Sequence, residues 1–276
     1  MAPPLTPTRI LAALEAEGLT VVEVGQWRTH TRTAESRPWG EVHGVMLHHT
    51  VTQGTAATVR ICRDGYAGLP GPLCHGVIDK AGRVHMVGSG RTNHAGGGDP
   101  RVLAQVRAES YGVRPSASTR TNANGVDGNR HFYGFECENL GDGRDPWPEA
   151  QVEAMVRAST AICRAHTTSE TAWGAKSVVG HLEWQKGKVD PRPAPGGSDV
   201  AMPELRARVA ERLEHPAGWN PGGSGPAGGA YVVKRGDGLY RIATAHGLTL
   251  AQLIDLNPQL IHPGDELRIS EHGGTR

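Results

Sequence analysis

The chain has 276 residues, with 29 lysines and arginines against 28 aspartates and glutamates, and a formal net charge of +1. This balance argues against a partner held by charge alone, so we expect neither nucleic acid nor a membrane surface as the ligand. No apolar run reaches the roughly 18 residues that cross a bilayer. The opening MAPPLTPTRI lacks the basic start and apolar core of a signal peptide. We therefore expect synthesis in the cytoplasm.

The cysteines, Cys62, Cys74, Cys137 and Cys163, show no CxxC spacing of a zinc ribbon or redox motif. Cysteine packs as a small apolar residue, so buried free thiols are the expected state for most of them. A bridge between Cys62 and Cys74 stays open as an alternative.

The chain begins with the pattern of a helix and then of a buried strand. In TPTRILAALEAEG, residues 6–18, the apolar residues recur at helical spacing and a glycine ends the run. The strand is expected at EVHGVMLHH, residues 41–49. Adjacent strand residues point to opposite faces, so only one of His48 and His49 can face a metal ion.

A hairpin and a long loop follow. LCHGVIDKAGRVHMVGSG holds two runs of alternating apolar residues, and the turn is expected at residues 79–82. From about residue 88 to residue 130 the chain is rich in Gly, Asn and Ser. Loops of this length inside compact domains are usually functional or mobile, so we expect this one to frame a substrate cleft.

The strand HFYGFECEN, residues 131–139, has two different faces. Alternation places Tyr133, Phe135 and Cys137 on one face, and Phe132, Gly134, Glu136 and Glu138 on the other. Two carboxylates on one face form either a solvated outer surface or part of a site. A helix from Pro148, a short strand ending in His181 and a helix over 199–213 then complete a mixed α/β domain.

Two candidate metal ligands, His181 and Asp190, lie in GHLEWQKGKVDP with the cation Lys188 between them. A third candidate, His48, lies upstream in GVMLHHT. A catalytic zinc ion usually takes three protein ligands and keeps one position for water, and two histidines with one carboxylate are an established set. The sequence therefore predicts a metallohydrolase.

Four motifs in chain order, VHGVMLHHT, CHGVIDKAGRVHMVGSGRTNHAG, YGFECEN and GHLEWQKGKVDP, resemble the zinc-dependent N-acetylmuramoyl-L-alanine amidases over residues 40–195. This is the amidase-2 or peptidoglycan-recognition-protein-like family. The resemblance implies a mixed central sheet flanked by helices. It also implies a zinc ion held by His48, His181 and Asp190.

The same resemblance implies that Glu136, rather than Glu138, and Lys188 are catalytic. Zinc lowers the pKa of its bound water to about 7, far below that of bulk water. Glu136 would accept the proton of this water and pass it to the leaving amine. Lys188 would stabilise the oxyanion of the tetrahedral intermediate, a contribution of roughly 3 kcal/mol or more. Cys74 stands where some members have a catalytic Tyr, so Glu136 must carry more of the proton transfer.

Further residues are expected near the substrate, and each has a plainer alternative in which it only packs or hydrogen-bonds within the fold. His94, in NHAG, resembles a histidine of the family's substrate cleft. The others are Asn93 and Arg91 for polar or acidic parts of the muropeptide, His75 at the cleft wall, and Trp184 beside the sugar.

Glycine and proline accumulate in HPAGWNPGGSGPAGGA, residues 215–230, as in a flexible linker. We therefore expect a catalytic domain over 1–214 and a second domain over 231–276. The second domain resembles the LysM domain, a small β-α-α-β module that binds the N-acetylglucosamine-containing chains of peptidoglycan or chitin. Gly238 departs from the Thr that is usual in that family.

Together these features predict a monomeric peptidoglycan hydrolase of the phage endolysin type. It would wait in the host cytoplasm and reach the wall after the membrane is permeabilised. Three alternatives stay open: a bacterial or prophage autolysin of the same activity, a zinc endopeptidase acting on the stem peptide, and a recognition protein that does not cut. No HExxH signature is present, which argues against the commonest class of metalloprotease.

Overall fold

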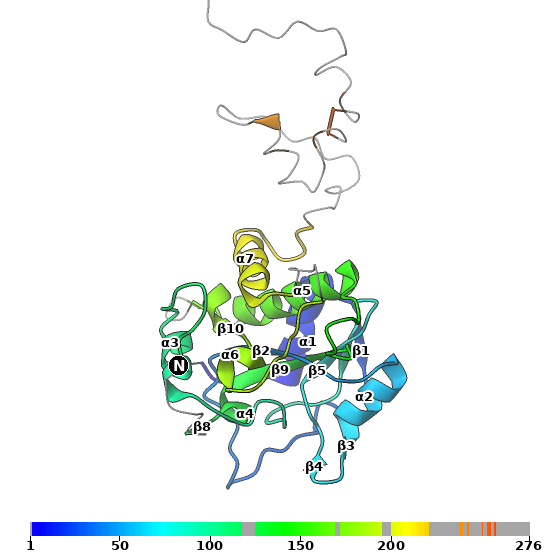
Figure 1. Cartoon of the computed structure of the whole chain (residues 1–276), viewed down its shortest axis with the longest axis vertical. Helices are drawn as coiled ribbons and strands as arrows, with labels where there is room; N and C mark the ends of the chain where they lie inside the picture. Colours follow the sequence, from blue (N-terminus) through cyan, green and yellow to red (C-terminus); the bar gives the residue numbers. More distant parts are fainter. Residues whose placement is uncertain are drawn as a thin grey trace, which may run out of the picture. The chain divides into compact units, whose positions relative to one another are not determined.

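The computed structural model describes residues 2–117, 125–168, 172–194 and 200–220 and a few positions after residue 237 (Figure 1). The chain divides into two compact units, Met1–Gly218 and Trp219–Arg276. Most of the expected linker and of the β-α-α-β arrangement lies outside the described residues. Within the described part, no helix combines the length and apolar character needed to cross a membrane.

A six-stranded mixed sheet forms the centre of the first unit (Figure 1). Its strands lie in the order β1 (Val21–Glu23), β6 (Val84–Met86), β5 (Gly76–Ile78), β9 (Phe132–Cys137), β2 (Gly44–His49) and β10 (Val178–Gly180). All neighbouring strands are parallel except β5 and β6. These two form the predicted hairpin, whose turn is held by the Asp79 carboxylate through the backbone N–H groups of Ala81 and Arg83.

Three helices contribute the larger core on one face of the sheet: α1 (Pro7–Ala16), α5 (Glu149–Ala165) and α7 (Met202–Leu213) (Figure 1). Thr6 caps α1 by accepting the backbone N–H of Arg9, and apolar residues of the helices meet Val45, Leu47 and Phe135 of the sheet. Just after α1, the buried Glu17 carboxylate accepts hydrogen bonds from Arg164 and Arg212. This largely buried ion network joins the three helices.

The opposite face is covered by α3 (Pro100–Arg107) and α6 (His181–Trp184), where Val102, Val106 and Trp184 pack on Met46 and Phe132. The remaining elements are α2 (Thr55–Asp64), α4 (Gly128–His131), the 3-10 helix Ala175–Ser177, and the paired short strands β3 (Gly65–Tyr66) with β4 (Leu69–Pro70) and β7 (Gly97–Gly98) with β8 (Val126–Asp127).

The mixed α/β prediction is confirmed, whereas the loop expected over residues 88–130 is in part wrong. That stretch contains α3, α4 and the β7–β8 pair. Asp99 caps α3 through the backbone N–H of Arg101, and Pro100 opens the helix, which is a start signal readable in the sequence. The four cysteines are all buried free thiols, so the alternative Cys62–Cys74 bridge is not formed.

Candidate active site

The candidate site lies at the carboxyl ends of three neighbouring parallel strands. His48 is near the end of β2 and is the register partner of Glu136 on β9. His181 directly follows β10, whose last residue, Gly180, pairs with Leu47 of β2. Open α/β sheets commonly bind ligands at the carboxyl ends of their parallel strands. The topology therefore gathers residues from three distant parts of the chain.

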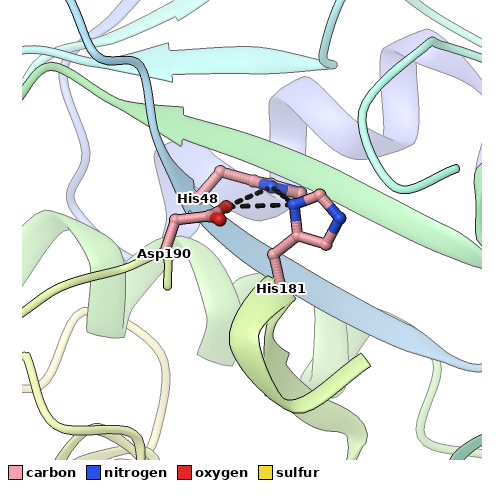
Figure 2. A group of neighbouring side chains, drawn as sticks. All are labelled: His48, His181 and Asp190. Carbon is pink, nitrogen blue, oxygen red and sulfur yellow. Dashed lines mark hydrogen bonds and ion pairs between the residues drawn. The ribbon is translucent and has the colours of Figure 1, made fainter. Parts of the chain in front are cut away.

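Figure 2 shows His48, His181 and Asp190 converging on one point. The Nδ1 atoms of the two histidines are 3.0 Å apart, and each is 3.0 Å from Oδ2 of Asp190. All three residues are buried. Zinc bonds of about 2.0–2.2 Å to nitrogen and oxygen place two ligands of one ion roughly 3 Å apart, so the triangle fits such an ion.

The outer nitrogen of His181 supports the same conclusion. Its Nε2 lies 3.2 Å from the carbonyl oxygen of Ala95 and 3.3 Å from Oε1 of Gln185. Because a carbonyl oxygen only accepts hydrogen bonds, Nε2 carries the proton of a neutral ring and leaves a lone pair on Nδ1. Burial lowers the pKa of His48 to about 4, and the neutral imidazole is the form that binds metals.

A buried ion pair fixes α6, the helix that begins with His181. Glu183 accepts the backbone N–H of Gly180 at 3.2 Å. The same carboxylate forms a two-point pair with Arg206 of α7, with nitrogen-to-oxygen distances of 2.8 and 2.9 Å. In this bidentate geometry, two parallel N–H···O bonds fix the orientation of the guanidinium group relative to the carboxylate. It ties the first turn of α6 to the rest of the domain.

Glu136 extends from the same face of the sheet as His48. Its Oε2 is buried and has no hydrogen-bond partner among the described residues. Burial raises the pKa of Glu136 to about 8, the charge of Asp190 acts in the same direction, and Lys188 opposes both. A carboxyl group with such a raised pKa, beside a potential metal site, is suited to proton transfer.

Glu138 lies beyond the end of β9 and has a different partner. Its carboxylate accepts hydrogen bonds from the backbone N–H of Gly54 at 2.8 Å and from the hydroxyl of Thr55 at 2.7 Å. These groups belong to the start of α2, where a negative charge is stabilising. The geometry is therefore consistent with the choice of Glu136 over Glu138.

Lys188 and Cys74 both interact electrostatically with Glu136. Lys188 is exposed, and its positive charge lowers the pKa of both Glu136 and His48, so it lies within electrostatic reach of both groups. Cys74 is fully buried, and burial raises the pKa of its thiol well above the ordinary value. It is therefore held as a neutral thiol beside the site.

The second histidine of the pair, His49, supports the segment that follows Asp190. Its Nδ1 accepts the backbone N–H of Arg192 at 3.2 Å, while Nε1 of Trp147 donates to the carbonyl oxygen of Arg192 at 2.9 Å. A side chain at Gly141 would collide with the ring of His49. The backbone of Arg192 is thus held from two directions, two residues after the candidate ligand.

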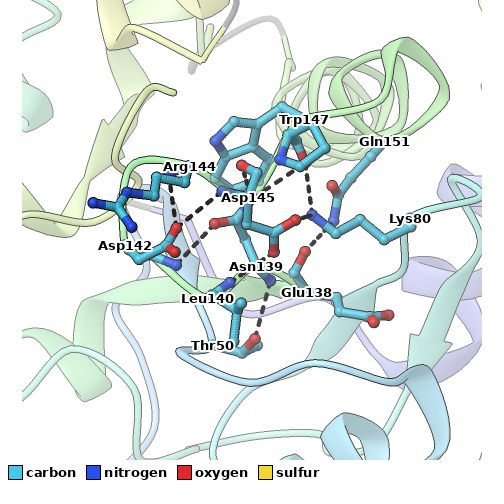
Figure 3. A network of polar contacts seen from close by, with 12 residues as sticks. Thr50, Lys80, Glu138, Asn139, Leu140, Asp142, Arg144, Asp145, Trp147 and Gln151 are labelled. Carbon is cyan, nitrogen blue, oxygen red and sulfur yellow. Dashed lines mark hydrogen bonds and ion pairs between the residues drawn. The ribbon is translucent and has the colours of Figure 1, made fainter. Parts of the chain in front are cut away.

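Trp147 and Gly141 belong to a loop after β9 that is fixed by the polar network in Figure 3. Asp145 is its centre, because one carboxylate oxygen accepts from Lys80 and the other from the backbone N–H of Leu140. Asn139 donates to the carbonyl oxygen of Asp145. Sequence reasoning did not single out this loop, although the turn-forming run NLGDGRDP was visible.

Most of the residues expected to contact substrate are instead buried within the fold. His75 is fully buried, its Nδ1 accepts from the backbone N–H of Gly134, and its Nε2 donates to the carbonyl oxygen of Gly90. Trp184 is 1% exposed, and its indole ring packs where Gly98 and Gly128 have no side chain. These positions favour the alternative in which both residues pack or hydrogen-bond within the fold.

In the loop, Arg91 is buried and pairs with Asp127 at 2.6 Å, which likewise favours a role within the fold. Asn93 is half-buried, with its amide donating to the carbonyl oxygen of Pro70. His94 is 8% exposed and contacts His48 rather than the surface. Its backbone is held by Asn129, a residue that sequence reasoning missed.

Residues 38–193 match the N-acetylmuramoyl-L-alanine amidase family, and residues 231–270 match the LysM domain. No curated protein matches the chain. Among solved structures, the N-acetylmuramoyl-L-alanine amidase LysC of Clostridium intestinale URNW is 17% identical with a TM-score of 0.41, covering 69% of this chain and 97% of that one.

The endolysin LysCS of the same organism is 17% identical with a TM-score of 0.40, covering 69% of this chain and 95% of its own. AmpDh3 of Pseudomonas aeruginosa, in complex with an anhydromuramic pentapeptide, is 20% identical with a TM-score of 0.40, covering 64% of this chain and 63% of its own. The assignment rests on the sequence match, which spans more than half of the 276 residues. The chain therefore belongs to the N-acetylmuramoyl-L-alanine amidase family and carries a C-terminal LysM domain.

Proposed function

We propose that the protein is a zinc-dependent hydrolase that cleaves the amide bond between the lactyl group of N-acetylmuramic acid and L-alanine of the stem peptide. The convergence of His48, His181 and Asp190 carries this proposal, because their ligand atoms lie 3.0 Å apart beside Glu136. Within the described part of the chain, this is the one group of three such residues close enough to share a metal ion.

A zinc ion held by these residues supplies Lewis acidity and a water whose pKa is about 7. Glu136 accepts the proton of the attacking water at Oε2, which has no other partner in the described structure. Lys188 stabilises the negative charge that develops on the former carbonyl oxygen. Glu136 then donates its proton to the amide nitrogen, so that the stem peptide leaves with a free amine and the lactyl group keeps a carboxylate.

The LysM domain supplies the second half of the proposed function. Once this domain holds the glycan chains of the wall, the catalytic domain meets a high effective concentration of its substrate. An amidase joined to a wall-binding module suits a lytic role. We therefore assign an endolysin-type activity to the protein and propose that it acts as a monomer. An autolysin of the same chemistry is the close variant.

Digestion of purified peptidoglycan, with and without a zinc chelator, tests the proposal. Mass analysis of the products and labelling of new amino termini identify the bond that is cut. Release of intact stem peptides with a free L-alanine terminus, suppressed by the chelator, is the expected result. New termini within the stem peptide would instead indicate an endopeptidase, and binding without cleavage would indicate a recognition protein.

A further inference from the structure

His94 lies across the His48 ring from the candidate metal site. Its Nδ1 is 2.9 Å from Nε2 of His48, and its Nε2 is 3.1 Å from the carbonyl oxygen of Phe132. The two imidazole rings meet edge to face, with centroids 5.1 Å apart and an interplanar angle of 88°. Both ring nitrogens of His94 are therefore occupied by protein groups, and neither is available to a substrate.

The chain of contacts determines where the protons sit. The carbonyl oxygen of Phe132 only accepts hydrogen bonds, so Nε2 of His94 must donate. In a neutral ring this leaves Nδ1 of His94 as an acceptor, and Nε2 of His48 must then donate to it. The remaining nitrogen of His48, Nδ1, carries a lone pair, and this is the atom that faces Asp190 and His181.

The surroundings hold His94 in this position. Oδ1 of Asn129 accepts the backbone N–H groups of His94 and Ala95, each at 2.8 Å. Gly134 of β9 lies directly against the imidazole, and any side chain there would overlap the ring of His94. The glycine in the YGFECEN motif is thus explained by the space that this histidine needs.

We propose that His94 is a positioning residue that fixes the tautomer and the orientation of the metal ligand His48. This inference rests on the proposed zinc site and deepens it. A metal-bound histidine generally donates its second ring N–H to a nearby acceptor, and loss of that acceptor weakens metal binding about 10-fold to 100-fold. His94 plays this part for His48, as the Ala95 carbonyl oxygen does for His181.

The test compares the zinc affinity of full-length variants by competition with a chromophoric chelator. His94→Phe keeps a ring of similar size but removes the acceptor, whereas His94→Asn keeps an acceptor near the position of Nδ1. His166→Phe is the matched control, because His166 is also a buried histidine but contacts Tyr133, whose side chain belongs to the other face of the sheet.

We expect His94→Phe to weaken zinc binding about 10-fold to 100-fold, His94→Asn to recover part of that loss, and His166→Phe to leave the affinity unchanged. Wild-type affinity in His94→Phe, or an equal loss in His166→Phe, would overturn the inference. A wild-type chain that binds no stoichiometric zinc would instead overturn the proposed metal site itself.

A second measurement needs no substitution and therefore does not depend on the folding of a variant. Long-range nitrogen–proton correlation spectra of the zinc-loaded wild type report which ring nitrogen of each histidine carries the proton. His48 and His94 should both be protonated on Nε2. A proton on Nδ1 of His94 would refute the hydrogen-bond chain, whatever the zinc affinity of the variants.

Discussion

Replacing Glu136 by glutamine should stabilise the metal-free protein at alkaline pH while it removes amidase activity. The wild-type carboxyl has a pKa raised from 4.5 to about 8, chiefly by burial, and one of its oxygens has no partner in the described structure. An ionised carboxylate at this position is therefore costly. Glutamine has nearly the same shape and no charge, so it avoids that cost but cannot accept the proton of the attacking water.

The sign and size of the effect follow from the two pKa values. A group whose pKa is raised on folding contributes stability below its unfolded pKa and loses that contribution as the pH rises through the folded value. Relative to Glu136→Gln, the unfolding free energy of the wild type should therefore fall as the pH rises from 4.5 to about 8. At about 1.4 kcal/mol for each pKa unit the ceiling is about 5 kcal/mol. Since the side chain is only partly buried, we expect about 2–4 kcal/mol.

Denaturant unfolding of chelator-treated protein at several pH values between 4 and 9 measures this difference. All other titrating groups are common to the two proteins, so the difference between their unfolding free energies isolates position 136. Glu138→Gln is the matched control: it weakens two hydrogen bonds at the start of α2 and should destabilise the protein by about 1 kcal/mol. A difference for Glu136→Gln that does not grow with pH would refute the reasoning.

Three further predictions concern the core, the sheet and the second domain. Glu17→Gln removes the buried charge that the buried Arg212 shares with the half-buried Arg164, and should lower the unfolding free energy by about 3–5 kcal/mol in urea. Gly134→Ala should cost about 1–3 kcal/mol and weaken zinc binding through its collision with His94, whereas Gly112→Ala, which meets open space, should do neither. Deletion of residues 219–276 should reduce lysis of whole walls far more than cleavage of soluble muropeptides, and an equal loss on both would contradict the tethering role.

The period of the apolar residues predicted which face of a strand each side chain occupies. The alternation in residues 132–137 placed Phe135 in the core and Glu136 on the opposite face, as the structure has them. It also separated His48 from His49. The helix α3 was missed because the glycine-rich surroundings outweighed its start signal at Asp99 and Pro100.

The role of His94 was not predictable in the same way. Whether a histidine in the NHAG motif faces the substrate or a metal-binding residue depends on how the loop after β6 packs against β9. That arrangement is set by contacts with Asn129 and Gly134, which lie 35 and 40 positions further along the chain. Motif resemblance placed the histidine near the site, but only the three-dimensional structure reveals its partners.

The two histidines at the end of β2 illustrate how one strand can serve both the site and its support. His48 and its neighbour point to opposite faces, and the first carries a candidate ligand atom while the second holds the backbone of Arg192, two residues after Asp190. Each of the three candidate ligands thus has its own restraint. His94 holds His48, the Ala95 carbonyl oxygen holds His181, and the fixed backbone of Arg192 restrains the segment that carries Asp190. Sites supported in this way keep their geometry without relying on the ligand. We therefore expect the three ligand atoms to stay close to their positions when the metal is removed, whereas the electrostatic environment of Glu136 changes.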